Sequence, residues 1–307
     1  MKRANDPYDV LVIGGGHAGL TAAHHAALRG LRVASVDDGW HMGGLVLNVS
    51  RLDDYPALGG VAGVEMAATQ LEAIMALNVD LVQESVTSLE VDGELKIVAT
   101  CSGVYKARTV VVASGARLKS LGVAGEEALF GRGVSQCADC DAGFFVDQKV
   151  VVIGGGDSAL QEALHLVDYA SSITLVCRGS EIKAKPSYLA KAVENPKFEF
   201  RRATQVVEII GKEGVESVRL AAADGAVEVL ACSGVFIFVG LTPNVGYLPN
   251  ELARDAQGFV VTDSSLRTNL LGIYAIGAVR AGYSGQLAQA AGEAVAAVAA
   301  IPATSHI

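Results

Sequence analysis

The feature that most constrains the fold is a pattern of strand, glycine-rich turn, helix and strand that occurs twice. Short apolar runs of this kind are typical of strands that are buried on both faces of a parallel sheet. The repeat predicts an α/β fold with two Rossmann-like, three-layer dinucleotide-binding domains. The first copy has a strand at 8–13, a turn at 14–19, a helix to about 29 and a strand at 32–36; the second has a strand at 149–153, a turn at 154–159, a helix to about 169 and a strand at 172–177.

The glycines of the first turn, Gly14, Gly16 and Gly19, have the spacing G-x-G-x-x-G. Such glycines let the backbone turn tightly and approach a pyrophosphate at the N-terminus of the helix. The following strand leads into Asp37, whose carboxylate can bind a ribose hydroxyl. The first copy therefore predicts a dinucleotide site.

The second copy differs at the position that contacts the ribose. Cys177 stands where the first copy has Asp37, and Arg178 follows it. An acid selects a free ribose 2′-hydroxyl, whereas a cation accommodates a 2′-phosphate. The two domains are therefore expected to bind different dinucleotides, and the second favours NADPH. The alternative is that Arg178 is a solvated surface arginine.

A pair of cysteines precedes the second copy. Cys137 and Cys140 are two residues apart and can close a small disulfide, and Asp141 adds a carboxylate that can handle protons. A dithiol beside a dinucleotide site suggests electron transfer between a nicotinamide and a disulfide, with a flavin as intermediary. The alternative, half of a zinc site, needs a second ligand pair; the other cysteines are isolated and the histidines lack metal spacing, so no metal is expected.

Composition narrows the class of protein further. The chain has 307 residues, of which 51% are hydrophobic and 19% charged, as expected for two folded domains. The formal net charge of −9 disfavours binding to nucleic acid or to anionic membranes. The start shows no secretory signal, and the apolar run at 287–301 is interrupted by polar residues and reads as a buried helix. Five cysteines in this length form no secreted disulfide framework, so a cytoplasmic protein is expected.

The order of elements predicts a discontinuous first domain. The strand and turn at 273–277 and the final helix cannot complete a domain alone, so the economical topology returns them to the first copy. The expected boundaries are 1–117 and 247–307 for the first domain and 118–246 for the second, which carries the cysteine pair.

Over nearly its whole length the sequence resembles the low-molecular-weight thioredoxin reductases, which are two-domain FAD and NADPH flavoproteins. The matches are GGGHAG at 14–19, Gly43-Gly44, ASG at 113–115, GRGVSQCADCD at 131–141, KVVVIGGGDSALQEA at 149–163, VGLTPN at 239–244 and GIYAIG at 272–277. The cysteine pair just ahead of the second glycine turn is the most specific of these.

The resemblance implies a homodimer and assigns roles to residues. It implies that Cys140 faces the flavin, that Cys137 exchanges with the substrate disulfide and that Asp141 donates and accepts the proton. The implied FAD residues are Gly14, Gly16, Gly19, Asp37, Gly43, Gly44, Ser114, Gly115, Gly277, Gln286 and Leu287. The implied NAD(P) residues are Gly154, Gly156, Asp157, Ser158, Arg178 and Lys183.

The sequence departs from the family pattern at three places. Ala278 follows Gly277 where the family has an acid that contacts the flavin ribityl chain. Gly179 stands where the family has a second arginine, which removes one cation from the 2′-phosphate motif. Asp139 adds a carboxylate between the cysteines; it either disfavours the thiolate or points into solvent.

These departures leave several functions open. The resemblance favours a reductase that moves electrons from NAD(P)H through FAD to a protein or small-molecule disulfide. The alternatives are a dithiol oxidase that passes electrons to oxygen, a reductase fed by another donor such as ferredoxin, and a flavin-binding regulatory protein. The intact Cys137, Cys140 and Asp141 argue against the last of these.

Overall fold

The computed structural model describes residues 6–39, 41–49, 51–52, 55 and 59–302. The chain divides into two compact units, one comprising 1–117 and 242–307 (unit 1) and the other 118–241 (unit 2). The chain returns to unit 1 at Thr242, whereas the expected return was at residue 247. The two connecting segments, β7 (Ala116–Leu118) and β16 (Leu241–Pro243), pair with each other, so the outward and return crossings are adjacent.

Unit 1 is built on a sheet in the order β3-β2-β1-β6-β5-β4, with β17 also paired to β6. The pairs β3–β2, β2–β1, β1–β6 and β6–β17 are parallel, whereas β4, β5 and β6 form an antiparallel meander. The strands are β1 (Tyr8–Ile13), β2 (Val33–Asp37), β3 (Asp80–Gln83), β4 (Val86–Asp92), β5 (Leu95–Thr100), β6 (Val104–Val112) and β17 (Ile273–Ala275).

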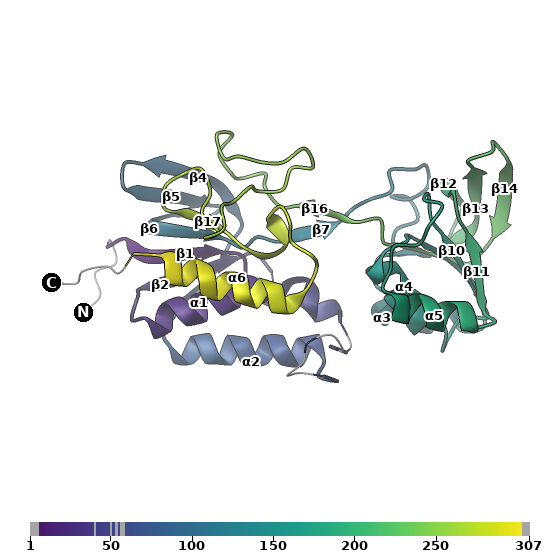
Figure 1. Ribbon diagram of the computed structural model, residues 1–307, viewed down its shortest axis with the longest axis horizontal. Helices are drawn as coiled ribbons and strands as arrows, with labels where there is room; N and C mark the ends of the chain where they lie inside the picture. Colours follow the sequence, from purple (N-terminus) through teal and green to yellow (C-terminus); the bar gives the residue numbers. More distant parts are fainter. Residues whose placement is uncertain (1–5, 40, 50, 53–54, 56–58, 303–307) are drawn as a thin grey trace. The chain divides into compact units, whose positions relative to one another are not determined.

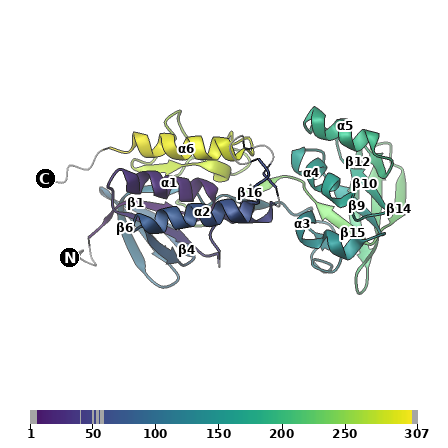
Figure 2. The same cartoon turned by 90° about the horizontal axis from the view of Figure 1, so that it is seen from below.

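Three helices cover one face of this sheet, with α1 between α2 and α6 (Figures 1 and 2). Leu20, Ile74 and Ala294 of these helices pack onto the inward-facing side chains of β1 and β6. The other face of the sheet packs against the segment 245–279, through side chains that include Leu248, Leu252 and Val260. The helical segments are α1 (His17–Leu28), η1 (Gly44–Asn48), α2 (Gly63–Ala76), η3 (Gly277–Val279) and α6 (Leu287–Ala300).

Unit 2 repeats the arrangement on a smaller scale. Its sheet is parallel throughout, in the order β11-β10-β9-β15-β8. Helices α4 and α5 pack on one face, and the antiparallel meander β12-β13-β14 covers the other. The elements are β8 (Val134–Ser135), α3 (Ala138–Asp141), η2 (Ala142–Phe145), β9 (Lys149–Ile153), α4 (Asp157–Leu166), β10 (Ser172–Val176), α5 (Pro186–Glu194), β11 (Phe198–Arg201), β12 (Thr204–Gly211), β13 (Val215–Ala222), β14 (Val227–Ala231) and β15 (Gly234–Ile237).

Each sheet is covered by helices on one face and by further segments of its own unit on the other. This arrangement is the three-layer α/β class expected from the repeat. In each unit a buried parallel strand, β1 or β9, leads through a glycine turn into a helix at the carboxyl end of the sheet. Ligands of open α/β sheets bind at this end of the strands.

Candidate active site

The glycine turn of unit 1 is shaped for close backbone approach. Gly14 has φ +112°, and a Cβ there would lie 2.3 Å from the carbonyl oxygen of Ala113. A Cβ at Gly19 would lie 1.9 Å from the carbonyl oxygen of Gly14, so only glycine allows α1 to pack this close to the turn. No side chain caps α1 at Gly16, which leaves the N–H groups of its first turn available to an anion. The turn therefore fits a dinucleotide pyrophosphate.

Asp37 and the Gly43-Gly44 pair lie beside this turn. Asp37 Oδ2 accepts a hydrogen bond from the Gly15 N–H at 2.6 Å, and its Oδ1 accepts one from the Gly39 N–H at 2.8 Å. The Gly43 N–H donates to the Gly15 carbonyl oxygen at 2.7 Å. Each carboxylate oxygen of Asp37 retains a second lone pair for a ribose hydroxyl.

The Ser114-Gly115 turn at the end of β6 is held by Asn244. The Ser114 hydroxyl donates to the carbonyl oxygen of Asn244 at 2.8 Å, and the Asn244 side-chain amide donates to the Ser114 carbonyl oxygen at 2.9 Å. The Ser114 hydroxyl is thus used inside the protein. At Gly115 an added Cβ would meet nothing within 4 Å, so this residue presents an open backbone surface.

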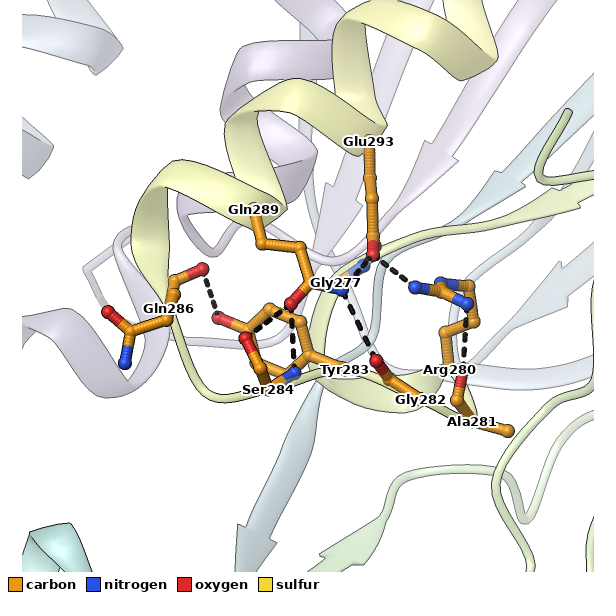
Figure 3. Close-up of polar contacts among 9 residues, drawn as sticks. All are labelled: Gly277, Arg280, Ala281, Gly282, Tyr283, Ser284, Gln286, Gln289 and Glu293. Carbon is orange, nitrogen blue, oxygen red and sulfur yellow. Dashed lines mark hydrogen bonds and ion pairs between the residues drawn. The ribbon is translucent and has the colours of Figure 1, made fainter. Parts of the chain in front are cut away.

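Gly277 takes part in a buried polar network with α6, shown in Figure 3. Glu293 Oε2 accepts the Gly277 N–H at 2.7 Å, and Glu293 Oε1 pairs with the Arg280 guanidinium and accepts from Gln289 Nε2 at 2.7 Å. The side chains of Glu293 and Arg280 are only 8% and 16% exposed. Although Ala278 lacks the family's acid, a carboxylate from α6 holds the backbone of this loop.

Gln286 and Leu287 begin α6. Gln286 is its N-cap, and Figure 3 shows its side-chain amide directed away from the Glu293 network. The carbonyl oxygen of Leu287 lies 3.2 Å from His17 Nε2, and His17 Nδ1 lies 3.1 Å from Gln70 Oε1. His17, which sequence reasoning missed, therefore links α1 to both α2 and α6; its place directly after Gly16 was the available signal.

The glycine turn of unit 2 repeats the geometry of the first. A Cβ at Gly154 would lie 2.3 Å from the carbonyl oxygen of Phe238, and no side chain caps α4 at Gly156. Ser158 is exposed in the first turn of α4. Unlike Ser158, the Asp157 side chain contacts a residue of the protein. Its Oδ1 accepts the Lys185 N–H at 2.7 Å, and its Oδ2 lies 3.8 Å from Lys185 Nζ. The turn fits a second pyrophosphate, while the Asp157 carboxylate fixes the chain ahead of α5.

Arg178 and Lys183 are both exposed beside this second turn. Arg178 directly follows the buried Cys177 at the end of β10. The Lys183 N–H donates to the Gly155 carbonyl oxygen at 2.7 Å, which ties the start of its side chain to the glycine turn. The structure therefore brings both predicted cations to the carboxyl end of β9 and β10.

Cys137 and Cys140 form a disulfide at the start of α3. Cys137 is the N-cap; its Sγ accepts the Cys140 N–H at 3.1 Å, and its own N–H donates to Ser135 Oγ at 3.0 Å. Cys140 is exposed, whereas Cys137 and Asp141 are half-buried. These contacts fix the backbone of the pair, and Asp141 directly follows Cys140 in the chain.

A group of polar side chains that sequence reasoning missed supports this pair from α4. Glu162 Oε2 accepts the Ala138 N–H at 2.8 Å, and His165 Nε2 lies 3.1 Å from Asp139 Oδ1. Burial raises the pKa of Glu162 to about 7; the Ala138 N–H opposes the shift and the Asp139 charge adds to it. Asp139 is therefore directed at α4 and not into bulk solvent. Glu162 and His165 are three residues apart on one helix face, which was the sequence signal.

No helix in the described part of the chain is long and apolar enough to cross a membrane. No cluster of three or more histidine, cysteine, aspartate or glutamate side chains in that part of the chain is arranged to hold a metal ion.

Comparison with known proteins gives the class that the two turns and the disulfide define. The family model described as "Pyridine nucleotide-disulphide oxidoreductase" matches residues 8–296. The thioredoxin reductase of Listeria innocua is 38% identical over 277 residues, which cover 89% of this chain and 86% of that protein. The thioredoxin reductase of Treponema pallidum is 36% identical and covers 89% of both.

Solved structures agree with the sequence comparison. The crystal structure of Lactococcus lactis thioredoxin reductase in its FR conformation has a TM-score of 0.92 at 33% identity and covers 96% of this chain and 97% of that one. Thioredoxin reductase of T. acidophilum has a TM-score of 0.90 at 29% identity, with the same coverage. The chain therefore belongs to the pyridine nucleotide-disulphide oxidoreductases and, within them, to the low-molecular-weight thioredoxin reductase family. It is an FAD-dependent disulfide oxidoreductase that uses NAD(P)H, so the predicted fold class and enzyme class are confirmed.

Proposed function

We propose that this protein uses NADPH to reduce the disulfide of a thioredoxin-like protein. The observation that carries the proposal is the Cys137–Cys140 disulfide, fixed at the N-terminus of α3, which precedes strand β9 and the glycine turn of unit 2. The names of its relatives support thioredoxin as the substrate.

The proposal assigns one dinucleotide to each unit. FAD is held in unit 1 by the Gly14–Gly19 turn, Asp37 and the Gly43-Gly44 backbone, with Ser114, Gly115, Gly277, Gln286 and Leu287 around it. NADPH is held in unit 2 by Gly154, Gly156 and Ser158, with Arg178 and Lys183 at its 2′-phosphate. Asp157 contributes by holding Lys185 and the chain that precedes α5. When bound, FAD supplies the two-electron relay between the nicotinamide and the dithiol.

The chain's own sulfurs then carry out disulfide exchange. Two electrons and two protons open the Cys137–Cys140 disulfide to a dithiol. The Cys137 thiolate attacks the substrate disulfide and forms a mixed disulfide, and the substrate's other sulfur leaves as a thiol. Cys140 attacks Cys137 Sγ, releases the second substrate thiol and restores the internal disulfide. Asp141, next to Cys140, accepts and donates the proton.

The proposal includes the setting in which the enzyme works. We place it in the cytoplasm as a homodimer, without nucleic acid or membrane as partner. The support is the family resemblance for the dimer and the net charge of −9 for the excluded partners. The thiols Cys101, Cys177 and Cys232, which form no disulfide, are consistent with a reducing compartment.

Steady-state reduction of thioredoxin by NADPH, in FAD-loaded protein, tests this function. We expect turnover in the wild type and none in Cys137→Ser or Cys140→Ser, both of which should keep FAD. Combining the two substitutions should add nothing, because the pair acts as one relay. Wild-type turnover in either single variant would contradict the assignment. Flavin reduction by a dithiol but not by either nicotinamide would replace the reductase by a dithiol oxidase.

A further inference from the structure

The sheet of unit 2 brings three strand ends to one place. Strands β9, β10 and β11 are neighbours and parallel, so their carboxyl ends lie at the same edge. There β9 leads into the Gly154 turn and β10 into Cys177-Arg178, while β11 ends at Arg201 and leads into Arg202. A dinucleotide bound at the Gly154 turn places its adenosine ribose toward the end of the adjacent strand β10. Side chains beside the end of β10 are therefore in position to recognise the 2′ substituent of that ribose.

Hydrogen bonds fix the chain after β11 against the end of β10. The Cys177 N–H donates to the Arg201 carbonyl oxygen at 2.9 Å, and the Thr204 N–H donates to the Cys177 carbonyl oxygen at 3.0 Å. The Ala203 N–H donates to the Gly179 carbonyl oxygen at 2.9 Å. Arg202 lies between these anchored residues, beside the segment from Cys177 to Gly179. The charge of Arg202 lowers the pKa of the Cys177 thiol, opposing the larger increase that burial causes.

The cations at this edge fall into two groups. Arg201 lies 2.6 Å from Glu199 and 3.6 Å from Glu228, and it is therefore already neutralised. In contrast, Arg178, Lys183 and Arg202 are exposed and form no ion pair with a carboxylate in the described part of the chain. The guanidinium of Arg202 lies 5.9 Å from the centre of the Phe200 ring, a contact that limits its range of positions without satisfying its N–H groups. Three cations without carboxylate partners around one strand end are suited to a phosphate dianion.

We propose that Arg202 is a specificity-determining residue, which supplies to the 2′-phosphate of NADPH the guanidinium that is missing at Gly179. This inference rests on the proposed NADPH site of unit 2. The segment 177–179 cannot supply a second guanidinium itself, because Gly179 has no side chain. Arg202 reaches the same strand end from β11, and a guanidinium can bind two phosphate oxygens at once.

Nucleotide binding to the full-length, FAD-loaded protein tests the inference. The variants are Arg202→Gln and, as a control with the same loss of charge, Arg219→Gln. Arg219 lies in the β13 strand of the meander and pairs with Glu208 at 2.8 Å. The probes are NADP⁺ and NAD⁺, measured by calorimetric titration. A charged hydrogen bond to phosphate corresponds to roughly ten- to a hundredfold in affinity.

We expect Arg202→Gln to weaken NADP⁺ binding by roughly ten- to a hundredfold and to leave NAD⁺ binding unchanged. Unchanged NAD⁺ binding would also show that unit 2 of the variant is folded. Arg219→Gln should change neither affinity. The inference is overturned if the wild type prefers NADP⁺ and Arg202→Gln keeps that preference, or if Arg202→Gln weakens both nucleotides equally. A wild type that binds NAD⁺ at least as tightly as NADP⁺ overturns the NADPH proposal together with this inference, so the two failures are distinguishable.

Discussion

Glu162 offers the sharpest test of the contacts that α4 makes with the segment of the redox pair. Its carboxylate accepts the Ala138 N–H at 2.8 Å and is largely buried, which raises the pKa of Glu162 from 4.5 to about 7. Glutamine has the same shape, and its amide oxygen can accept the same hydrogen bond without carrying a charge. Replacing Glu162 by glutamine therefore removes the cost of burying the ionised carboxylate and little else.

The sign and size of the effect follow from proton linkage. Between pH 4.5 and about 7 the folded protein binds a proton at Glu162 that the unfolded chain has lost, so the folding stability contributed by this group falls as the pH rises through that window. One pKa unit corresponds to about 1.4 kcal/mol, so the shift corresponds to at most about 3 kcal/mol. We expect Glu162→Gln and the wild type to be equally stable below pH 4.5, and the variant to be more stable by up to about 3 kcal/mol at pH 8.

Hydrogen exchange of peptides from β9 and α4, corrected for the intrinsic rate at each pH, measures the opening free energy of unit 2 alone. Glu162→Ala is the matched control. It leaves the Ala138 N–H without an acceptor, and it should be less stable than Glu162→Gln at every pH by about 1–3 kcal/mol. A stability difference between wild type and Glu162→Gln that does not change from pH 4.5 to 8 would refute the buried, high-pKa carboxyl.

Three further predictions concern other parts of the site. His165→Gln breaks the contact between His165 and Asp139 and should slow iodoacetamide alkylation of Cys137 in the reduced protein several-fold at neutral pH; adding Asp139→Asn should restore the rate, and a rate that neither change alters would contradict an electrostatic role for this contact. Glu293→Gln leaves the Arg280 charge buried without its ion pair to Glu293 and should destabilise unit 1 by about 3–5 kcal/mol. On heating, FAD fluorescence should then rise at a lower temperature than in the wild type, and an unchanged melting profile would contradict the network of Figure 3. Gly179→Arg should lower KM for NADPH and leave KM for NADH unchanged, while equal changes in both would argue against a phosphate contact at this position.

The elements that the sequence revealed are those whose chemistry is local. The glycine turns after β1 and β9 follow from fixed spacings, because a Cβ at Gly14 or Gly154 would lie 2.3 Å from a neighbouring carbonyl oxygen. The Cys137–Cys140 pair likewise needs only the two-residue spacing. Such features can be read without knowing which elements are neighbours in space.

The features that the sequence did not reveal depend on tertiary neighbours. Asp139 has its partner on α4, and whether it met His165 or water could not be decided before the packing of α3 was known. The Gly277 loop is held by Glu293 from the middle of α6. Strand β11 was not predicted, because its sequence, FEFR, is short and half-buried. Without β11 the place of Arg202 beside Cys177 could not be inferred.

The central claim is that electrons from NADPH reach the Cys137–Cys140 disulfide. The most direct measurement is to incubate FAD-loaded protein with NADPH under anaerobic conditions, alkylate it with iodoacetamide, and map the modified cysteines by mass spectrometry. We predict that Cys137 and Cys140 are alkylated after NADPH and remain disulfide-bonded without it. A flavin that is reduced by NADPH while Cys137 and Cys140 stay disulfide-bonded would contradict the account.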